Sequence, residues 1–263
     1  MAHVFVRDLE PVPGTGRLAL RDNDAHHLGR ALRLRPGEAV TASDGSGNVV
    51  EGHWDGTGLA VSPGGGVTAY PAPAPEITVA FSLTKGAHPE EAVQKLTESG
   101  VDVIAVIVAE RSVARWPVDG GAQRQMARLE EVARQAAMQC RRAWLPRLAG
   151  PFSLDAFAGR HPGLALAAPG GEALSLSTPV VAIGPEGGWS ERELGLASKL
   201  VSLGPHVLRA ATAATAAGVL LSALRSGLVA PAAGPVASHA GLVASNAAAA
   251  AAPQELEGRQ AQS

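Results

Sequence analysis

Several residue types are scarce in this sequence, and each shortage excludes a class of protein. Cysteine occurs once, at Cys140, which excludes a disulfide framework and a cysteine-based zinc site. No apolar run reaches the roughly 18 uninterrupted residues that span a bilayer. The first residues, MAHVFVRDLE, carry charges where a signal peptide needs an apolar stretch. We therefore expect a soluble, cytoplasmic protein with no metal and no membrane contact.

Aromatic residues are also rare, at 3% of the 263 residues, so the core must be aliphatic. The 46% share of hydrophobic residues excludes a wholly disordered chain. A net charge of −2 argues against a polycationic nucleic-acid binder. Eight arginines nevertheless lie between residues 111 and 147, among only three acids. A genome rich in G and C explains the general excess of arginine over lysine, but this cluster indicates a basic surface suited to forked phosphate contacts.

Residues 1–70 have the pattern of a small β-rich domain. Short β-type runs alternate with turn sequences such as Pro36-Gly37, and one short helix, capped by Asp24, is expected over residues 26–33. This pattern predicts a small barrel. Residues 71–76 follow as a proline-rich, extended linker, which we take as the domain boundary.

Residues 77–228 alternate between apolar strands and helices. We expect strands at 77–83, 101–109, 163–168, 179–184 and 201–203, and helices at 89–99, 123–142, 191–200 and 210–226. Continuous apolar strands between helices predict an α/β domain with a mainly parallel sheet covered on both faces. Ligands of such sheets lie beyond the carboxyl ends of the strands. The Ala-rich tail, 229–263, has few groups that could anchor it and is expected to be disordered.

Three of the expected strands end in loops that contain glycine, within 164–171, 180–190 and 201–209. Glycine permits close approach of the backbone to a ligand, yet such a loop is more often a plain turn between strand and helix. Neither a G-x-G-x-x-G sequence nor a phosphate-loop lysine accompanies them, which disfavours a Rossmann dinucleotide site and an NTPase. A G-x-S-x-G sequence is also absent, so an α/β hydrolase has little support.

The residues of these loops are more informative than their glycine content. IGPEGGWSERE at 183–193 and SLGPHVLR at 202–209 resemble the ribosomal RNA small subunit methyltransferase E family, a SPOUT-class family that uses S-adenosylmethionine. Further strings resemble the same family: HHLGRALR at 26–33, FSLTKG at 81–86, AERSV at 109–113 and ARQAAMQCRR at 133–142. The resemblance covers residues 3–228.

The resemblance implies an α/β fold in which a small PUA-like β-barrel precedes a SPOUT-type parallel sheet with a deep trefoil knot at its C-terminal end. It also implies a homodimer whose active sites lie at the subunit interface. The family methylates N3 of one uridine in small-subunit (16S) ribosomal RNA. The implied partner is therefore the assembled 30S-type subunit and its RNA.

Carried over residue by residue, the resemblance implies particular binding residues. The cofactor pocket would be formed by Ala168, Ile183, Gly184, Pro185, Glu186, Gly187, Gly188, Leu203, Gly204, Val207, Leu208 and Arg209. The RNA would be contacted by Arg30, Arg33, Arg35, Lys85, Arg111, Arg141 and Arg142.

The chemistry indicates two catalytic candidates. Methyl transfer to uridine N3 needs a nitrogen that has lost or shares its proton. Arg209 is our candidate for the cation that stabilises the developing anion. Glu186 is our candidate for the carboxylate that accepts the proton, although an acid here also suits the N-terminal end of a helix.

The sequence departs from the family pattern at Ala211, where many relatives carry an acid, and at His88, His206 and Met138. The target is therefore less well defined than the cofactor. Two alternatives stay open: a SPOUT methyltransferase with another RNA target, and an RNA-binding assembly factor that has lost transferase activity.

Overall fold

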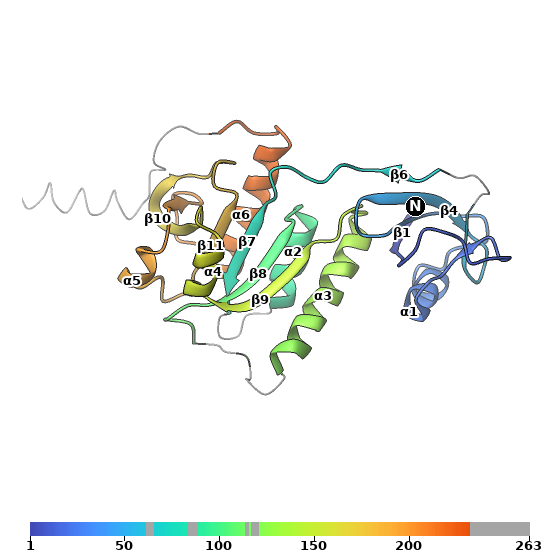
Figure 1. The fold of residues 1–263 in the computed structure, drawn as a ribbon, viewed down its shortest axis with the longest axis horizontal. Helices are drawn as coiled ribbons and strands as arrows, with labels where there is room; N and C mark the ends of the chain where they lie inside the picture. The colour runs from blue at the N-terminus through green and yellow to red at the C-terminus, as the bar shows by residue number, and fades with distance from the viewer. Residues whose placement is uncertain (62–65, 84–88, 114–115, 117–120, 232–263) are drawn as a thin grey trace, which may run out of the picture.

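The computed structural model describes residues 1–61, 66–83, 89–113, 116 and 121–231. A strongly curved sheet lies at one end of the molecule, and a second sheet covered by helices lies at the other (Figure 1). The long helix α3 (Gly121–Gln139) extends from the second part toward the first. The described elements therefore form a β-rich N-terminal part and a larger α/β part.

The N-terminal part is a six-stranded sheet with the order β1-β3-β4-β5-β2, and β6 pairs with β4. Its strands are β1 (Ala2–Phe5), β2 (Arg17–Leu18), β3 (Ala39–Ser43), β4 (Asn48–Trp54), β5 (Leu59–Val61) and β6 (Thr68–Ala69). β1 runs parallel to β3, whereas the other neighbours are antiparallel. The turn between β3 and β4 uses Gly45 and Gly47 at φ values of 79° and 91°, which favour glycine.

The short helix of this part differs from the expectation. Helix α1 (Asp22–His26) continues into a π-helical turn, η1 (His27–Ala31). The prediction that Asp24 caps the helix is wrong, because the capping position is Arg21 and Asp24 is buried inside the helix. Its carboxylate instead accepts two hydrogen bonds, of 2.9 and 3.0 Å, from Arg134 of α3. A long-range ion pair therefore determines the environment of Asp24.

The second part contains a parallel six-stranded sheet with the order β12-β10-β11-β7-β8-β9. Its strands are β7 (Thr78–Ser82), β8 (Val103–Val108), β9 (Arg147–Ser153), β10 (Ala165–Ala173), β11 (Val180–Ile183) and β12 (Lys199–Ser202). Its other helices are α2 (Pro89–Glu98), α4 (Leu154–Arg160), α5 (Glu191–Leu194) and α6 (Ala210–Arg225). The predicted parallel α/β sheet is confirmed.

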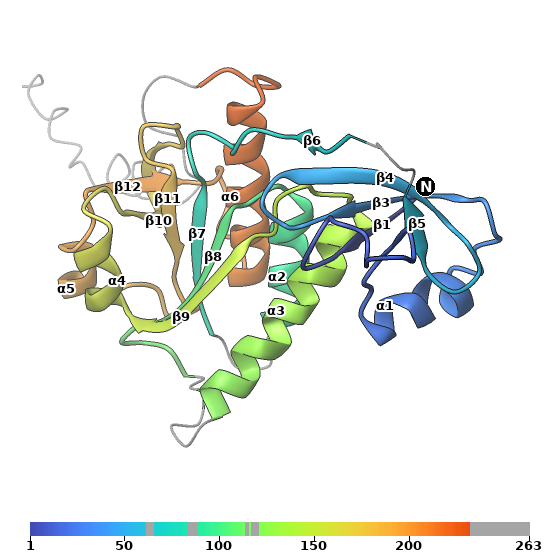
Figure 2. The same cartoon turned by 45° about the vertical axis from the view of Figure 1, so that its right-hand side comes forward.

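Helices cover both faces of this sheet (Figure 2). Helices α2, α3 and α6 pack on one face through buried side chains that include Leu96, Leu129 and Leu221. Helix α4 packs on the other face through Leu154 and Phe157. The core is mostly aliphatic, as the composition requires, with Phe157 among its few aromatic side chains. Within the described ranges, no helix combines the length and apolar character needed to cross a bilayer.

Two elements were not predicted, and one helix is shorter than expected. β9 and α4 escape the pattern because Gly150 and Pro151 interrupt the apolar sequence of an edge strand, where proline is tolerated. The helix expected over 191–200 ends at Leu194, since Gly195 follows it and β12 already begins at Lys199. Most of the tail that was expected to be disordered, and Lys85, lie outside the described residues.

The end of α3 joins the two parts. Ala137 and Met138 belong to the apolar core of the N-terminal sheet, although they lie on a helix of the second part. Ser43 of β3 also donates a 2.7 Å hydrogen bond to the carbonyl oxygen of Ala143. These contacts fix the N-terminal sheet against α3.

Asp102, just before β8, connects the amino-terminal edge of the parallel sheet to two helix ends. Its carboxylate accepts hydrogen bonds from the Ile77 backbone (2.9 Å), from Arg142 after α3 (3.4 Å) and from Arg225 at the end of α6. Arg225 also donates to the carbonyl of Gly100 at 2.7 Å. Only 12% of the Asp102 side chain is exposed, so these charges interact with little screening by water.

We expect Asp102→Ala to lower the free energy of unfolding by about 3–5 kcal/mol, because it leaves two largely buried arginines without their shared carboxylate. Chemical denaturation measures this change. The control is Glu172→Ala, which removes the exposed partner of Lys199 and should cost below about 1 kcal/mol. Equal effects of the two substitutions would contradict the central role of Asp102.

Candidate active site at the strand ends

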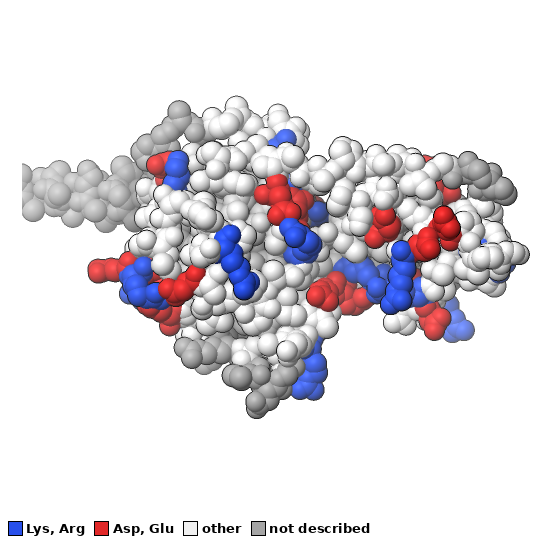
Figure 3. Space-filling view, viewed as in Figure 1, with Lys and Arg blue, Asp and Glu red and all other residues white. Residues whose placement is uncertain are grey.

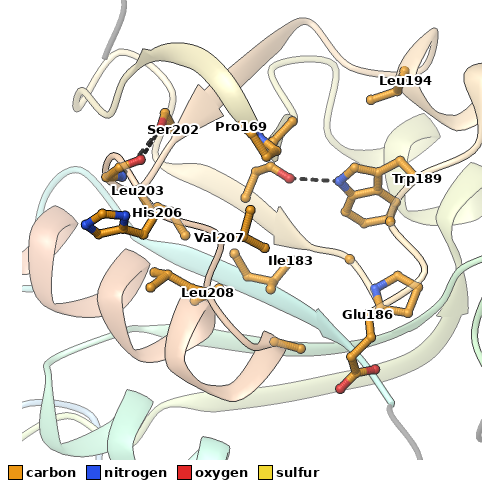
Figure 4. Close-up of a pocket in the computed structure, with 18 residues that line it drawn as sticks. Pro169, Ile183, Glu186, Trp189, Leu194, Ser202, Leu203, His206, Val207 and Leu208 are labelled. Atoms are coloured by element: carbon orange, nitrogen blue, oxygen red, sulfur yellow. Dashed lines mark hydrogen bonds between the residues drawn. The ribbon is translucent and has the colours of Figure 1, made fainter. Parts of the chain in front are cut away.

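A pocket of about 350 Å³ opens beside the ends of β11 and β12 (Figure 4). Its volume lies within the range of small-molecule sites. Three segments and the start of α6 contribute to it, and the lining residues are Ala167, Ala168, Pro169, Ile183, Gly184, Pro185, Glu186, Gly188, Trp189, Leu194, Ser202, Leu203, Gly204, His206, Val207, Leu208, Ala210 and Ala213. The pocket therefore lies where ligands of parallel sheets bind.

Trp189 forms one wall of the pocket. Its indole Nε1 donates a 3.0 Å hydrogen bond to the carbonyl oxygen of Ala167 on β10, and the side chain is 8% exposed (Figure 4). A Cβ at Gly184 would lie 2.9 Å from the indole ring, closer than real contacts allow. Gly184 is therefore required for the tryptophan to pack against the end of β11.

The opposite wall is aliphatic and follows β12. Ser202 Oγ donates a 3.0 Å hydrogen bond to the carbonyl oxygen of Gly204, whose φ of 147° favours glycine. The next segment leads back over the pocket, and Val207 is 79% exposed although it lines the cavity. Such an exposed apolar side chain beside peptide groups suits a ligand with both a flat apolar ring and hydrogen-bonding edges.

The loop after β11 is tied to the end of β8. Glu193, which forms a capping box with Ser190 at the start of α5, also accepts a 2.8 Å hydrogen bond from the backbone N–H of Glu110. Arg111 Nη1 donates a 3.0 Å hydrogen bond to the carbonyl oxygen of Gly187. These contacts hold the pocket loop in one conformation against a second strand end.

An ion-pair network supports the same loop. Arg192 of α5 pairs with Glu110 and with Asp155 of α4. Hydrogen bonds from Ser190 and Arg192 lower the pKa of Glu110, and the hydrogen bond from Arg192 lowers the pKa of Asp155. Because their pKa values are lowered, both carboxylates stay negatively charged at neutral pH and keep their ion pairs with Arg192, which hold α5 in place.

Ten of the twelve residues predicted to bind the cofactor line this pocket. The exceptions are Gly187 and Arg209. A Cβ at Gly187 would meet Arg111 at 3.3 Å, so this residue faces the Arg111 side chain. Arg209 is the exposed capping residue of α6, directly between the lining residues Leu208 and Ala210. Glu186 is exposed at the pocket.

The sequence patterns missed several lining residues, above all Trp189, Pro169, Ser202 and His206. A tryptophan directly after two glycines, in a chain with few aromatic residues, was the available signal for Trp189. No signal of this kind marks Pro169 or Ser202, because their position depends on how β10 and β12 pair.

The predicted RNA-binding arginines separate into two groups. Arg30, Arg33, Arg35 and Arg141 are exposed, and no acidic partner pairs with them within the described part of the chain. Arg142 is largely buried and donates to the carbonyls of Thr97 (2.9 Å) and Val101 (2.8 Å) and to Asp102. This geometry gives Arg142 a structural role and corrects its assignment as a phosphate ligand.

Basic side chains do not form one continuous surface on the face drawn in Figure 3, where many lie beside acidic ones. Arg111 reaches the pocket loop, and Lys85 lies outside the described residues. No group of three or more potential metal ligands gathers among the residues that the structure describes.

We expect Gly184→Val to lower the affinity for S-adenosylmethionine at least about tenfold, because the new side chain displaces Trp189 and narrows the pocket. The matched control is Gly187→Ala, whose Cβ faces Arg111 instead of the cavity and should change the affinity much less. Isothermal titration calorimetry measures both. A Gly184→Val protein that binds as tightly as the wild type would remove the cofactor from this pocket.

Comparison with known proteins gives a consistent result. The family model described as an RNA methyltransferase domain matches residues 71–222, and the model described as an RNA methyltransferase PUA domain matches residues 20–53. The ribosomal RNA small subunit methyltransferase E of Mycobacterium bovis is 32% identical over 247 residues, which cover 81% of this chain and 91% of that protein. The enzyme of the same name from Synechocystis is 31% identical over 225 residues, which cover 76% of this chain and 70% of that protein.

Solved structures are similar over the same region. A ribosomal RNA small subunit methyltransferase E from Neisseria gonorrhoeae bound to S-adenosylmethionine superposes with a TM-score of 0.69 and 25% identity, covering 85% of this chain and 98% of that one. A methyltransferase from Legionella pneumophila in complex with the same cofactor superposes with a TM-score of 0.71 and 27% identity. The superposition covers 84% of this chain and 97% of that one. The chain belongs to the ribosomal RNA small subunit methyltransferase E family.

Proposed function

We propose that this protein uses S-adenosylmethionine to methylate N3 of one uridine in small-subunit (16S) ribosomal RNA, within the assembled 30S-type subunit. The observation that carries the proposal is the pocket at the strand ends, which ten of the residues expected to bind the cofactor line together. The similar proteins from Neisseria gonorrhoeae and Legionella pneumophila contain this cofactor.

The residues present fit the cofactor. Gly184 and Gly188 keep the loop backbone free of side chains, Gly188 at a φ of 69°, so that peptide groups can approach a ligand. Ile183 and Val207 offer apolar contact for an adenine ring. When bound, S-adenosylmethionine supplies a methyl group on a sulfonium, which an in-line nucleophile accepts. The role of the chain is to orient donor and acceptor and to exclude water.

Two side chains have the chemistry to assist the transfer. Glu186 supplies the one carboxylate among the described lining residues, and it accepts the N3 proton. Arg209 caps α6 next to the lining residue Leu208, and its guanidinium stabilises the negative charge that develops on the uracil ring. Ala211 lies exposed on the first turn of α6, so this chain performs the reaction without an acid there.

The deep trefoil knot and the homodimer are part of this proposal. The chain passes from β11 to the edge strand β12, on the far side of β10, and then returns as α6 to pack against the middle of the sheet. That return path supports the proposed knot, in which the C-terminal segment threads through an earlier loop of the chain. Val219 of α6 and Leu228 after it are 49% and 81% exposed, which supports contact with a second copy.

RNA contacts follow from the exposed arginines. Arg30 in η1, Arg33 and Arg35 just after it and Arg141 after α3 are exposed and free to contact phosphates, which position the RNA without reading its sequence. The target base is then read after it has left its stack. Ala211 stands where many relatives carry an acid, so methylation of another RNA target is the second candidate function.

The first test is methyl transfer from labelled S-adenosylmethionine to small subunits that lack the modification, and separately to free 16S RNA. We expect N3-methyluridine as the product nucleoside from the subunits, identified by mass spectrometry. Another methylated nucleoside would shift the assignment to a different RNA target. Cofactor binding without transfer to either acceptor would support the binding-protein alternative.

A second test concerns Arg209. We expect Arg209→Gln to lower kcat by about 10²–10³-fold, as when a group that stabilises a transition-state anion is lost, while the affinity for S-adenosylmethionine stays the same. Arg124→Gln, an exposed arginine of α3 away from the pocket, is the matched control. Single-turnover kinetics measure the step, and an unchanged rate would remove Arg209 from catalysis.

A further inference from the structure

The indole of Trp189 connects two strands just beyond the point where their pairing stops. The β10–β11 ladder ends at the pair Leu166 and Ala182. The next carbonyl of β10, that of Ala167, accepts a 3.0 Å hydrogen bond from Trp189 Nε1 (Figure 4). A side chain from the loop after β11 therefore takes the place of the next backbone donor and ties this loop to β10.

The segment that follows Ala167 leaves the regular sheet. Ala167 and Glu172 both lie opposite Val201 of β12, so the intervening residues, 168–171, bulge from the ladder. The first two residues of this bulge line the pocket at the strand ends. Because the bond from Trp189 holds the residue directly before the bulge, it fixes where this wall of the pocket begins.

The other end of the bulge is held by close packing of the backbone. A Cβ at Gly171 would lie 2.6 Å from the backbone of Val201, so the chain there lies directly against β12. Gly170, one residue earlier, has a φ of 77° that favours glycine. The indole bond is thus the side-chain contact that holds the end of the bulge nearest to β11.

The indole is itself fixed by its surroundings. It is 8% exposed and belongs to the same buried cluster as Leu154 and Phe157 of α4. A Cβ at Gly184 would lie 2.9–3.2 Å from three atoms of the indole, so the end of β11 packs over the middle of the ring. A side chain held in this way can determine the position of the carbonyl to which it donates.

We propose that Trp189 is a positioning residue for S-adenosylmethionine, because its indole N–H holds Ala167 and the bulge after it at the spacing from Gly184 that the cofactor needs. The wall held in this way contacts the cofactor equally before and after methyl transfer. Loss of the N–H therefore weakens S-adenosylmethionine and S-adenosylhomocysteine alike. The inference rests on the proposed function in one respect, since it takes the pocket at the strand ends as the cofactor site.

Trp144 supplies a matched control, because it repeats both features at another place. Its Nε1 donates a 3.1 Å hydrogen bond to the carbonyl oxygen of Tyr70, and a Cβ at Gly47 would lie 2.6 Å from its indole. It does not line the pocket at the strand ends. Trp144→Phe therefore removes the same type of hydrogen bond without changing the wall of the pocket.

Isothermal titration calorimetry with S-adenosylmethionine and S-adenosylhomocysteine tests the proposal. We expect Trp189→Phe to weaken both ligands about 3–10-fold, the effect of one neutral hydrogen bond, and Trp144→Phe to leave both affinities unchanged. In the transfer assay, the KM for S-adenosylmethionine should rise by the same factor, and kcat should change less than KM. Equal affinities of the two variants would overturn the proposal, as would a fall in kcat without a rise in KM.

A second variant separates the N–H from the volume of the ring. Trp189→benzothienylalanine, introduced by stop-codon suppression, places sulfur where the indole has its N–H and keeps the shape of the side chain. We expect it to lose as much affinity as Trp189→Phe, while chemical denaturation shows a smaller loss of stability. Wild-type affinity in this variant would contradict the role of the N–H.

The outcomes distinguish this inference from the assignment of the pocket. If Gly184→Val weakens binding of S-adenosylmethionine and Trp189→Phe does not, the pocket stands and the role of Trp189 fails. If neither weakens binding although the wild type binds the cofactor, both assignments fail. Calorimetry needs no methyl transfer, so the comparison of Trp189→Phe with Trp144→Phe stays decisive even if the protein does not methylate small-subunit RNA.

Discussion

The shared carboxylate of Asp102 is the contact on which the arrangement of the larger domain depends. It binds the first residue before β7, the segment after α3 and the last turn of α6 in one largely buried cluster. Two cations around one acid are stable there because Arg142 and Arg225 also bond to backbone carbonyls, which accept the remaining donors. The amino-terminal edge of the sheet is thereby fixed, while the carboxyl edge is left to form a pocket.

The carboxyl edge is organised in a different way. There the chain uses glycine and one tryptophan, since Gly184 lets Trp189 lie against the end of β11. Two hydrogen bonds with the end of β8 then hold the loop from outside. Glu193 accepts one from the backbone N–H of Glu110, and Arg111 donates one to the carbonyl of Gly187. A pocket built largely from backbone and aliphatic groups suits a reaction in which the protein aligns two reactants and stabilises charge at one place.

The sequence predicted those features that depend on local pattern. Continuous apolar strands between helices indicated a parallel sheet, and the strings at 183–193 and 202–209 indicated where the pocket lies. Features that depend on distant partners were missed or misread. Asp24 resembles a cap in sequence, but Arg134, 110 residues away, holds it inside the helix.

Arg142 shows the same limit. It is adjacent to Arg141 and has the same chemistry, so a sequence pattern treats both as phosphate ligands. Only the fold shows that the carbonyl oxygens of Thr97 in α2 and of Val101 after it accept hydrogen bonds from the Arg142 guanidinium, while Arg141 turns outward at a φ of 58°. The edge strand β9 was missed for a related reason, because Gly150 and Pro151 are acceptable only at the edge of a sheet, and edge position is a property of the whole topology.

The charge of the molecule constrains how it can hold RNA. A chain with net charge −2, whose arginines often lie beside acids, gains little from the release of counterions that supplies most nonspecific affinity. Under the proposed function, selectivity must therefore come from pockets that accept particular bases. The target base must then be bound beside the pocket at the strand ends, where methyl donor and acceptor have to be aligned.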